Sequence, residues 1–302
     1  MPTSTLTAEV VTRYVADTVG REVIGVRTLP GSVANQDFLV RLADASAVVV
    51  KAGPRAEMAA EAWACRRLTT IGVPVPPVVA VDLDTGLGGL PTLIVDFVPG
   101  GPSESPDVAY QAGRRFRRVH AEVLPGWGPL IVDGHEEGSP VRGAHASWAE
   151  AVHAELSGLP ELVDAGVIDG RLAAAARACV LIDELLGYAG PGVLLHQDLK
   201  PAHLFGVEDG DGQRLTAVID WGGAGVGDPV ADLARLSMAG ATVTEAFLAG
   251  YERRLTDDLA DRLTRYRILW HVGTLSYEHR AGGDWFDVYR QRLRADVGQL
   301  TS

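Results

Sequence analysis

The chain has 302 residues, of which 47% are hydrophobic and 22% are charged, a composition typical of a soluble globular protein. Its formal net charge of −12 argues against a general nucleic-acid binder, which needs a basic face, and favours a cationic substrate. No apolar run approaches the ~20 residues of a membrane span, and the N-terminus lacks the pattern of a signal peptide. We therefore expect a cytoplasmic protein with no membrane partner, in which Cys65 and Cys179 are reduced thiols.

The first 99 residues predict a small, β-rich domain. A helix is expected over Thr7–Val19, where apolar residues recur at helical spacing. Short apolar runs rich in β-branched residues predict strands over Val23–Leu29, Asp37–Leu42, Ala47–Lys51 and Thr92–Val98. A helix over Arg55–Thr69 follows the Gly-Pro break after Lys51, and the segment IGVPVPPVVAVD leads into a further strand.

Residues 100–302 predict a larger and mainly helical domain. The run Pro99–Pro102 breaks the last strand of the first domain. Helices are expected over Pro106–Val123, Ser147–Leu156, Arg171–Leu186, Val230–Met238, Val243–Leu255 and Asp257–Trp270, with further helix to about Val297. The polar, Gly-rich stretch from Gly126 to Gly143 predicts a loop.

Two short apolar runs between these helices predict buried strands that each lead into an aspartate. Val193–Leu195 leads into His196 and Asp198, and Leu215–Ile219 leads into Asp220. A polar turn rich in Gly and Asp separates the two runs. Asp198 and Asp220 are therefore expected at strand ends, where a rigid sheet presents polar groups to a cleft.

The residues after these strands match the parts that phosphoryl transfer needs. Those parts are a carboxylate beside the attacking hydroxyl, ligands for Mg²⁺ and a cation on the phosphates. Asp198 would accept the hydroxyl proton, and Lys200 would hold the γ-phosphate. His203 and Asp220 would be the metal ligands. Because Mg²⁺ prefers oxygen, the alternative is that His203 is only hydrogen-bonded in the loop.

The order of these residues resembles the catalytic and metal loops of the kinase superfamily. The chain has HQDLKPAH from His196 to His203, DWG at Asp220, and GVGDPVADLA from Gly225 to Ala234. The last run resembles the aminoglycoside phosphotransferases and the choline-kinase-like small-molecule kinases. Asp228 follows Asp220 too closely for the activation loop of a protein kinase. His203 departs from the Asn of most members, and macrolide phosphotransferases are similar in having His there.

The resemblance spans nearly the whole chain and implies an α+β, bilobal protein-kinase-like fold. A small lobe with a five-stranded sheet, residues 1–99, would bind ATP or GTP, and residues 100–302 would form a mainly helical lobe for catalysis and substrate binding. Lys51 would be the strand-three lysine of kinases, oriented by Glu61 or, as the alternative, by Glu57. Further nucleotide contacts would come from Ser32 in the PGSVANQ turn and from the main chain of Asp96, Phe97 and Val98.

Lysine usage supports the two positions that the resemblance assigns to phosphate. The 27 basic residues include two lysines, Lys51 and Lys200, and the other 25 are arginine. An ammonium is a compact point charge and a guanidinium is a planar fork, so the two are not interchangeable on phosphate. A chain that otherwise uses arginine keeps lysine at the two positions where a kinase needs it.

Other residues take positions that the resemblance places around the cleft. His196, Asp228 and Asp232 would brace the catalytic loop. The acceptor substrate would lie between the helix that begins near residue 147 and the last helices of the chain. Its candidate contacts are Trp148, Glu150, Trp270, Glu278, Asp284, Trp285 and Asp287.

The expected reaction is the Mg²⁺-dependent transfer of the γ-phosphoryl group of ATP or GTP to a hydroxyl of a small molecule. The expected acceptor is an antibiotic, such as an aminoglycoside, a macrolide or a sugar-bearing nucleoside antibiotic, and its phosphorylation would give resistance. Three alternatives stay open: a metabolite kinase similar to choline or homoserine kinases, a pseudokinase that binds nucleotide without turnover, and a protein kinase, which the short spacing from Asp220 to Asp228 disfavours. The protein would act as a monomer or a homodimer.

Overall fold

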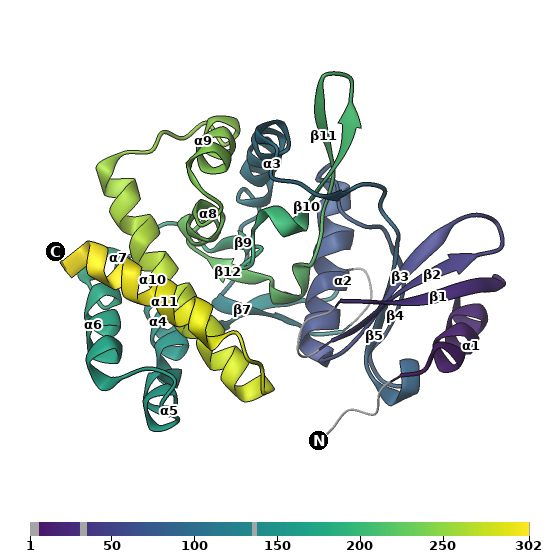
Figure 1. The fold of residues 1–302 in the computed structure, drawn as a ribbon, viewed down its shortest axis with the longest axis horizontal. Coiled ribbons are helices and arrows are strands. Elements are labelled where there is room, and N and C mark those ends of the chain that lie inside the picture. Colours follow the sequence, from purple (N-terminus) through teal and green to yellow (C-terminus); the bar gives the residue numbers. More distant parts are fainter. Residues whose placement is uncertain (1–5, 31–34, 135–137, 302) are drawn as a thin grey trace.

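The computed structural model describes residues 6–30, 35–134 and 138–301 and shows two parts of unequal size (Figure 1). The smaller part is a five-stranded sheet with a helix on one face, and the larger part is mainly helical. Helix α2 (Arg55–Thr70) lies where the two parts meet. Among the described residues, no helix has the length and apolar character needed to cross a membrane.

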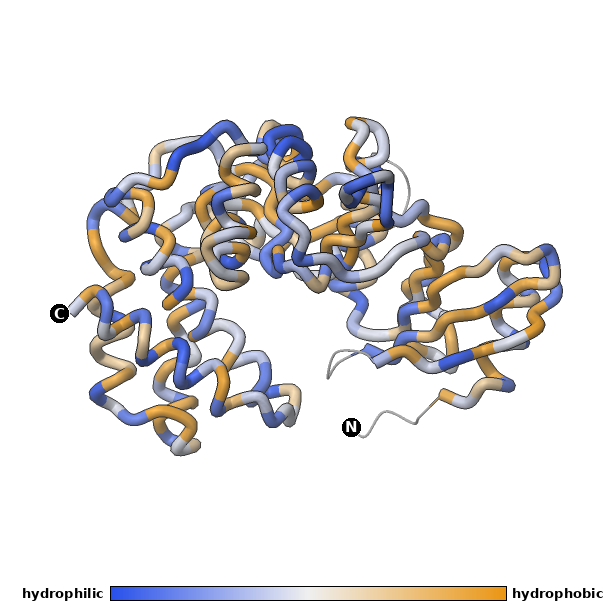
Figure 2. The backbone as a smooth tube through the Cα atoms, turned by 45° about the horizontal axis from the view of Figure 1, so that its top comes forward, coloured by the Kyte–Doolittle hydropathy of each residue, from blue (hydrophilic) through white to orange (hydrophobic). Residues whose placement is uncertain are grey.

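The sheet of the smaller part is antiparallel throughout, and apolar residues follow its strands while polar residues follow its turns (Figure 2). Its strands are β1 (Val23–Leu29), β2 (Gln36–Leu42), β3 (Ala47–Ala52), β4 (Val78–Asp82) and β5 (Thr92–Asp96), in the order β1-β2-β3-β5-β4. Helix α1 (Ala8–Val19) covers one face, where Val11 and Val15 pack in one buried cluster with Val40 and Val50. Because side chains alternate along a strand, Lys51 points to the opposite face.

The larger part is built from helices around two short sheets. Its helices are α3 (Pro106–Val119), α4 (Trp148–Glu155), α5 (Leu159–Asp164), α6 (Gly170–Val180), α7 (Asp183–Leu186), α8 (Val230–Ser237), α9 (Ala241–Gly250), α10 (Asp257–Ala281) and α11 (Phe286–Thr301). Its strands are β6 (Gly101–Pro102), β7 (Trp127–Val132), β8 (Val141–His145), β9 (Val193–Leu195), β10 (Leu204–Asp209), β11 (Gly212–Val218) and β12 (Gly225–Gly227). The sheet orders are β8-β7-β12-β9 and β11-β10-β6.

Side-chain caps set where several helices begin. The Thr7 hydroxyl accepts a hydrogen bond from the Val10 N–H at the start of α1, and Thr256 caps α10 in the same way. At α4 the Ser147 hydroxyl accepts from the Glu150 N–H, while Glu150 Oε2 accepts from the Ala146 N–H. This arrangement is close to a capping box and explains why Glu150 stands at its position.

The stretch from Gly126 to Gly143, which the sequence predicts as a loop, contains strand β7 and the start of β8, and residues 135–137 within it lie outside the described residues. Strands β7 and β8 pair antiparallel, and β7 also pairs with β12. The glycines that suggested a loop mark close backbone approach instead, because a Cβ on Gly143 would lie 2.1 Å from the Trp127 nitrogen. Leu130 of β7 is buried, and its side chain packs the hairpin against the hydrophobic core.

Four predicted helix boundaries also differ from the structure, and one of them is the helix predicted over Val243–Leu255, which is α9 and ends at Gly250. The predicted helix over Pro106–Val123 ends at Val119, because the next residue, His120, turns its ring toward buried partners in other elements. The predicted helix over Arg171–Leu186 divides into α6 and α7, with Leu181 in a non-helical conformation between them. Helix α10 continues past Trp270 to Ala281 without a break.

Phe116 of α3 lies in the core of the larger part, where α3 packs against β9 and β11, the two strands that lead into Asp198 and Asp220. It is fully buried, and its ring stacks on Trp221 with centroids 6.0 Å apart. Phe247 of α9 packs beside it at 5.7 Å. Helices α3 and α9 approach closely because a glycine stands at their contact: a Cβ on Gly113 would lie 2.1 Å from the Phe247 carbonyl oxygen.

Replacing Phe116 with Ala should lower the free energy of unfolding by about 3–5 kcal/mol, because it leaves a cavity among buried rings. Urea denaturation followed by circular dichroism measures the change. Tyr110→Ala is the matched control, because Tyr110 lies on the same helix with 45% of its surface exposed. The control should change stability far less, and equal losses in the two variants would contradict this account of the core.

Candidate active site

Lys51 lies near the end of β3 and links the two parts of the protein. Its Nζ donates to Glu61 Oε2 at 2.5 Å and to Asp220 Oδ1 at 2.8 Å. Glu61 belongs to α2, whereas Asp220 follows β11 in the larger part. Glu57, the alternative partner, instead accepts a hydrogen bond from Asn35 Nδ2 at 3.1 Å. The structure thus places Glu61, rather than Glu57, against Lys51.

Burial and the neighbouring charges shift the pKa values of Lys51, Glu61 and Asp220 in opposite directions. Lys51 is 7% exposed and Glu61 is 2% exposed. Burial disfavours the ammonium, but the carboxylates of Glu61 and Asp220 outweigh it and raise the pKa of Lys51 well above its ordinary value. Burial raises the pKa of Glu61, and Lys51 opposes that rise. At Asp220, the Lys51 ammonium outweighs burial and holds the pKa well below its ordinary value, so this carboxylate is charged at neutral pH.

A buried carboxylate of α8 holds the backbone of residues 196–203, called here the 196–203 loop. Asp232 Oδ2 accepts from the His196 N–H, and Oδ1 accepts from the Gln197 N–H, both at 2.8 Å. Asp232 is fully buried. Gln197 has a φ of 71°, a left-handed conformation that residues other than glycine rarely adopt. Two charge-assisted hydrogen bonds next to this strained residue fix the direction in which the loop continues.

His196 joins the 196–203 loop to the strand that precedes Asp220. Its Nε2 donates to the Ile219 carbonyl oxygen at 2.9 Å, and its Nδ1 accepts from the Asp198 N–H at 3.3 Å. The ring packs on Trp221 with centroids 4.5 Å apart. A fully buried side chain with these partners braces the loop and offers no free edge to a substrate.

Asp228 is another buried side chain with several partners, and it lies just before the start of α8. Its Oδ2 accepts from the Tyr266 hydroxyl and from Arg262 Nη2, both at 2.6 Å, and its Oδ1 accepts from the Val230 N–H at 3.0 Å. Asp228 is 1% exposed. These contacts fasten the beginning of α8 to α10 and thereby set the position of the helix that carries Asp232.

Asp198 lies at the centre of the site, and both of its carboxylate oxygens are paired. Arg235 Nε donates to Oδ1 at 2.7 Å, and Lys200 Nζ donates to Oδ2 at 2.6 Å. The neighbouring cations, Arg235 above all, outweigh burial and lower the pKa of Asp198 below its ordinary value. The side chain is 32% exposed, so a reactant can reach it.

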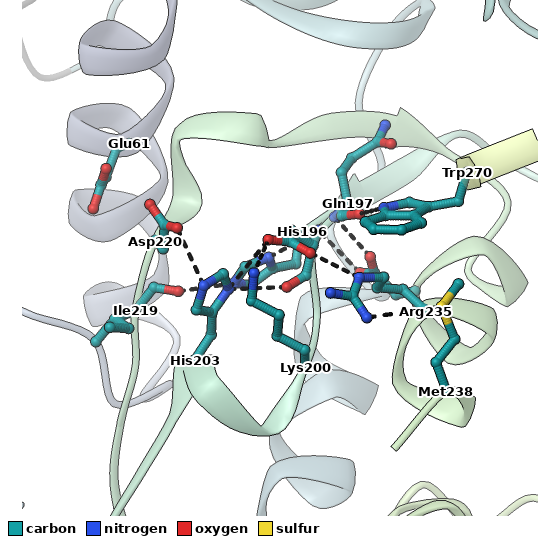
Figure 3. A network of polar contacts seen from close by, with 12 residues as sticks. Glu61, His196, Gln197, Lys200, His203, Ile219, Asp220, Arg235, Met238 and Trp270 are labelled. Carbon is teal, nitrogen blue, oxygen red and sulfur yellow. Dashed lines mark hydrogen bonds and ion pairs between the residues drawn. The ribbon is translucent and has the colours of Figure 1, made fainter. Parts of the chain in front are cut away.

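His203 and Asp220 face each other at the predicted metal position (Figure 3). His203 Nδ1 lies 2.9 Å from the Asp198 carbonyl oxygen, which can only accept, so Nδ1 carries the ring proton. Burial lowers the pKa of His203 to about 4, so the ring is neutral at pH 7 and Nε2 has a free lone pair. This Nε2 lies 3.2 Å from Asp220 Oδ2, which is also an acceptor. Two facing acceptors repel each other unless a cation lies between them.

A divalent cation therefore fits the donor set that the chain provides. Asp198, His203 and Asp220 each offer one ligand atom, and these atoms lie within 4.8 Å of one another. The hydrogen bond from His203 Nδ1 to a backbone carbonyl is the usual support of a metal-bound imidazole. Carboxylate oxygens suit Mg²⁺, and the imidazole nitrogen is its softer ligand here.

The segment predicted to contact the nucleotide base follows β5, which ends at Asp96 rather than at Val98. Asp96, Phe97 and Val98 line a surface pocket of about 750 Å³. The N–H groups of Asp96 and Phe97 already donate to the carbonyl oxygens of Pro77 and Ala47, so they are not free for a base. Ser32, the predicted phosphate contact, lies outside the described residues.

The residues predicted to contact the acceptor lie in different environments. Trp148 is 7% exposed, and its ring packs on Trp127 and Tyr266, so it belongs to the core. Glu150 is exposed, and its carboxylate accepts a hydrogen bond from the Ala146 N–H at the start of α4. Trp270 is partly exposed, and its Nε1 donates to the Gln197 carbonyl oxygen at 2.9 Å, which brings it beside the 196–203 loop.

The other acceptor candidates lie at the end of α10 and the start of α11. Glu278 is 8% exposed, and its Oε2 is buried with no hydrogen-bond partner in the described part of the chain. Trp285 is 57% exposed. Asp284 and Asp287 are exposed as well, and Asp287 pairs with Arg290. The contacts of these side chains with an acceptor remain predictions.

Arg235, which donates to Asp198 Oδ1, was not predicted as a site residue from the sequence. A signal was present, because Arg235 follows Asp232 by three residues and shares its face of the helix. The left-handed conformation of Gln197 had no sequence signal, since Asn or Gly would be the usual residue at such a position.

Comparison with known proteins agrees with this geometry. A model of the phosphotransferase enzyme family matches residues 25–267. Similar solved structures include a thermostable mutant of aminoglycoside phosphotransferase APH(4)-Ia in ternary complex with AMP-PNP and hygromycin B, with 18% identity, a TM-score of 0.72 and coverage of 96% of this chain and 98% of that chain. Comparison with curated protein sequences finds no match.

Two further similar structures are named for other acceptors, a fructosamine and a macrolide. A putative fructosamine-3-kinase from Thermobifida fusca YX-ER1 has 24% identity, a TM-score of 0.68 and coverage of 95% of this chain and 98% of that chain. The macrolide 2'-phosphotransferase MphH from Brachybacterium faecium has 20% identity, a TM-score of 0.61 and coverage of 96% and 97%. At these identities the likeness shows the fold, and it confirms the predicted α+β, bilobal kinase-like architecture.

The family match includes the charged residues that form the centre of the site. Lys51 and Glu61, the 196–203 loop, Asp220 and Arg235 all lie inside residues 25–267. This agreement confirms the predicted resemblance and the predicted class of enzyme, a small-molecule kinase. The chain therefore belongs to the phosphotransferase enzyme family.

Proposed function

We propose that the protein transfers the γ-phosphoryl group of ATP or GTP to a hydroxyl of a small-molecule antibiotic. The observation that carries the proposal is the position of Asp198, a partly exposed carboxylate beside the facing acceptors of His203 and Asp220. Proteins of similar fold include one crystallised with hygromycin B and a macrolide 2'-phosphotransferase. Aminoglycosides, macrolides and sugar-bearing nucleoside antibiotics are therefore the proposed acceptors.

Each charged residue of the site has a role in this reaction. Asp198 orients the acceptor hydroxyl and takes its proton as the oxygen attacks the γ-phosphorus. The bond from that phosphorus to the β,γ-bridging oxygen breaks, and the nucleoside diphosphate leaves with the electron pair. Lys51 and Lys200 neutralise charge on the phosphate oxygens. Mg²⁺ held by His203 and Asp220 supplies further neutralisation of phosphate charge when it is bound.

A pocket of about 400 Å³ between α4 and α10 is the proposed place of the acceptor. It is lined by Ala154, Glu155, Gly273, Ser276, Tyr277, Arg280 and Ala281. Tyr277 also hydrogen-bonds Glu57 of α2, which ties this wall of the pocket to the smaller part. The mixture of a carboxylate, a guanidinium and hydroxyls suits a polar, hydroxylated molecule.

The net charge of −12 supports an acceptor that also has a cationic group, because a negatively charged protein attracts cationic molecules at long range.

The experiment that tests the proposal is an assay of nucleotide consumption by the purified protein. ATP and GTP are each supplied with Mg²⁺ and a panel of aminoglycosides, macrolides, nucleoside antibiotics, choline, homoserine and fructosamines. Mass spectrometry of the same samples then looks for the gain of one phosphate. We expect phosphate on an antibiotic.

The other outcomes of this assay are equally specific. Phosphate on choline, homoserine or a fructosamine would replace the antibiotic by a metabolite as the acceptor, while keeping the reaction. Nucleotide binding without product on any compound would favour the pseudokinase. Since Lys51, Asp198 and Asp220 are all present and paired, we expect turnover.

Asp198→Ala should reduce kcat by roughly 10²–10⁴-fold, the usual contribution of a general base. Nucleotide affinity should change little, because Lys51, Glu61 and Asp220 keep their contacts. Steady-state kinetics and calorimetry of nucleotide binding measure the two quantities. Asp209→Ala is the control, as Asp209 is exposed at the end of β10 that lies away from the 196–203 loop. Near-full activity of Asp198→Ala would remove Asp198 from the role of base.

His203→Asn should retain turnover, because an amide oxygen is a suitable ligand for Mg²⁺ at this position. His203→Phe, which fills the space without a ligand atom, should require a much higher Mg²⁺ concentration. Titration of activity with Mg²⁺ compares the variants, and Mn²⁺ binding by electron paramagnetic resonance provides a readout independent of turnover. Complete loss of turnover in His203→Asn, with unchanged Mn²⁺ binding, would assign His203 another role.

A further inference from the structure

Arg235 is placed against Asp198 by contacts on both faces of its side chain. It lies on α8, and its side chain is 10% exposed. Nε donates to Asp198 Oδ1 at 2.7 Å, while the guanidinium carbon lies 4.2 Å from the centroid of the Trp270 ring (Figure 3). The stacked indole and the carboxylate together leave the guanidinium one orientation.

Trp270 connects the same guanidinium to the backbone of the 196–203 loop. Its Nε1 donates to the carbonyl oxygen of Gln197, the left-handed residue directly before Asp198. The Tyr289 ring packs edge-on against the indole with centroids 5.7 Å apart, so the indole is itself fixed. Trp270 of α10 therefore fixes the position of the Gln197 peptide, which precedes Asp198. It also fixes the orientation of Arg235, which contacts the Asp198 carboxylate.

The two cations on Asp198 differ in their freedom to move. The Lys200 side chain is 31% exposed and contacts Oδ2, whereas the Arg235 side chain is 10% exposed and contacts Oδ1. With Lys200 on Oδ2, the acceptor hydroxyl would share that oxygen with an ammonium, which weakens the oxygen as a base. The exposed Lys200 can leave Oδ2 for a phosphate, and the stacked Arg235 cannot leave Oδ1. The geometry therefore separates an exchangeable partner from a permanent one.

A second part-buried arginine of the larger part forms an ion pair that joins two helices. Arg267 of α10 pairs with Asp296 of α11 at 2.8 Å, and its side chain is 16% exposed. That carboxylate has no part in the site. Arg235 differs because its carboxylate partner belongs to the 196–203 loop and reaches the cleft.

We propose that Arg235, held by Trp270, is a positioning residue that keeps Asp198 Oδ1 occupied and presents Oδ2 to the acceptor hydroxyl. The inference rests on the proposed function, in which Asp198 takes the hydroxyl proton. It adds a residue that orients the base and never touches the acceptor. Removal of Arg235 leaves the carboxylate free to rotate about its side-chain torsions, so fewer encounters have the productive geometry.

The test compares Arg235→Gln, Arg235→Lys, Trp270→Phe and Arg267→Gln with the wild-type protein. Phosphoryl transfer is measured on the acceptor that the panel identifies, and nucleotide hydrolysis by water is measured in parallel. We expect Arg235→Gln to lower kcat by about 10–100-fold, as displacements near 1 Å do, with KM for the nucleotide within about two-fold. Arg235→Lys should recover part of the loss, since an ammonium can still pair with Oδ1. Trp270→Phe should lose less, because its ring keeps the stacking contact.

Arg267→Gln is the matched control for stability. It also removes a part-buried ion pair, so it should lower the melting temperature about as much as Arg235→Gln while leaving kcat unchanged. Turnover of Arg235→Gln within two-fold of wild type would overturn the inference. So would a loss that Arg235→Lys does not recover and that includes nucleotide binding, which would mean a folding role. A wild-type protein without transfer or hydrolysis would instead overturn the proposed function, and the inference with it.

Discussion

The contact of one buried ammonium with two carboxylates is the interaction on which the rest of the site depends. Lys51 comes from the sheet of the smaller part, Glu61 from α2 and Asp220 from a strand end of the larger part. A buried charge without a partner is costly, so the buried Lys51 and Glu61 hold each other in place, and Asp220, whose side chain is 43% exposed, joins them from the larger part. The relative position of the two parts is thus coupled to the position of Asp220, and through Asp220 to that of His203.

A second buried charge, the Asp232 carboxylate, holds the backbone of the 196–203 loop in place. Asp232 accepts the N–H groups of His196 and Gln197, and three residues later on the same helix Arg235 contacts Asp198. Helix α8 therefore holds both the main chain and the side chain of the loop that carries the reactive carboxylate. The left-handed conformation of Gln197 is stable only because these partners surround it on two sides.

Most of this site was predictable because its residues lie close together in sequence or in a regular pattern. Asp198, Lys200 and His203 share one loop, and the strand that ends near Lys51 was evident from its β-branched residues. Pairings between distant segments were not predictable. Arg235 reaches Asp198 across 37 residues, and nothing in the order of the residues says which carboxylate a helix arginine will meet. The β7–β8 hairpin was missed because its glycines allow close backbone contact, which looks in sequence like a loop.

The uneven use of lysine and arginine follows from what each position asks of its cation. At Lys51 two carboxylate oxygens from different elements converge within 2.8 Å of one nitrogen, a geometry that a compact ammonium satisfies and a planar guanidinium does not. At Lys200 the cation has to exchange a carboxylate for a phosphate, which a flexible and partly exposed chain permits. At Arg235 the cation has to stay, and a guanidinium stacked on an indole meets that need. A chain with 25 arginines and two lysines thus keeps the ammonium for the positions where charge must be compact or mobile, and uses the guanidinium where the contact must be permanent.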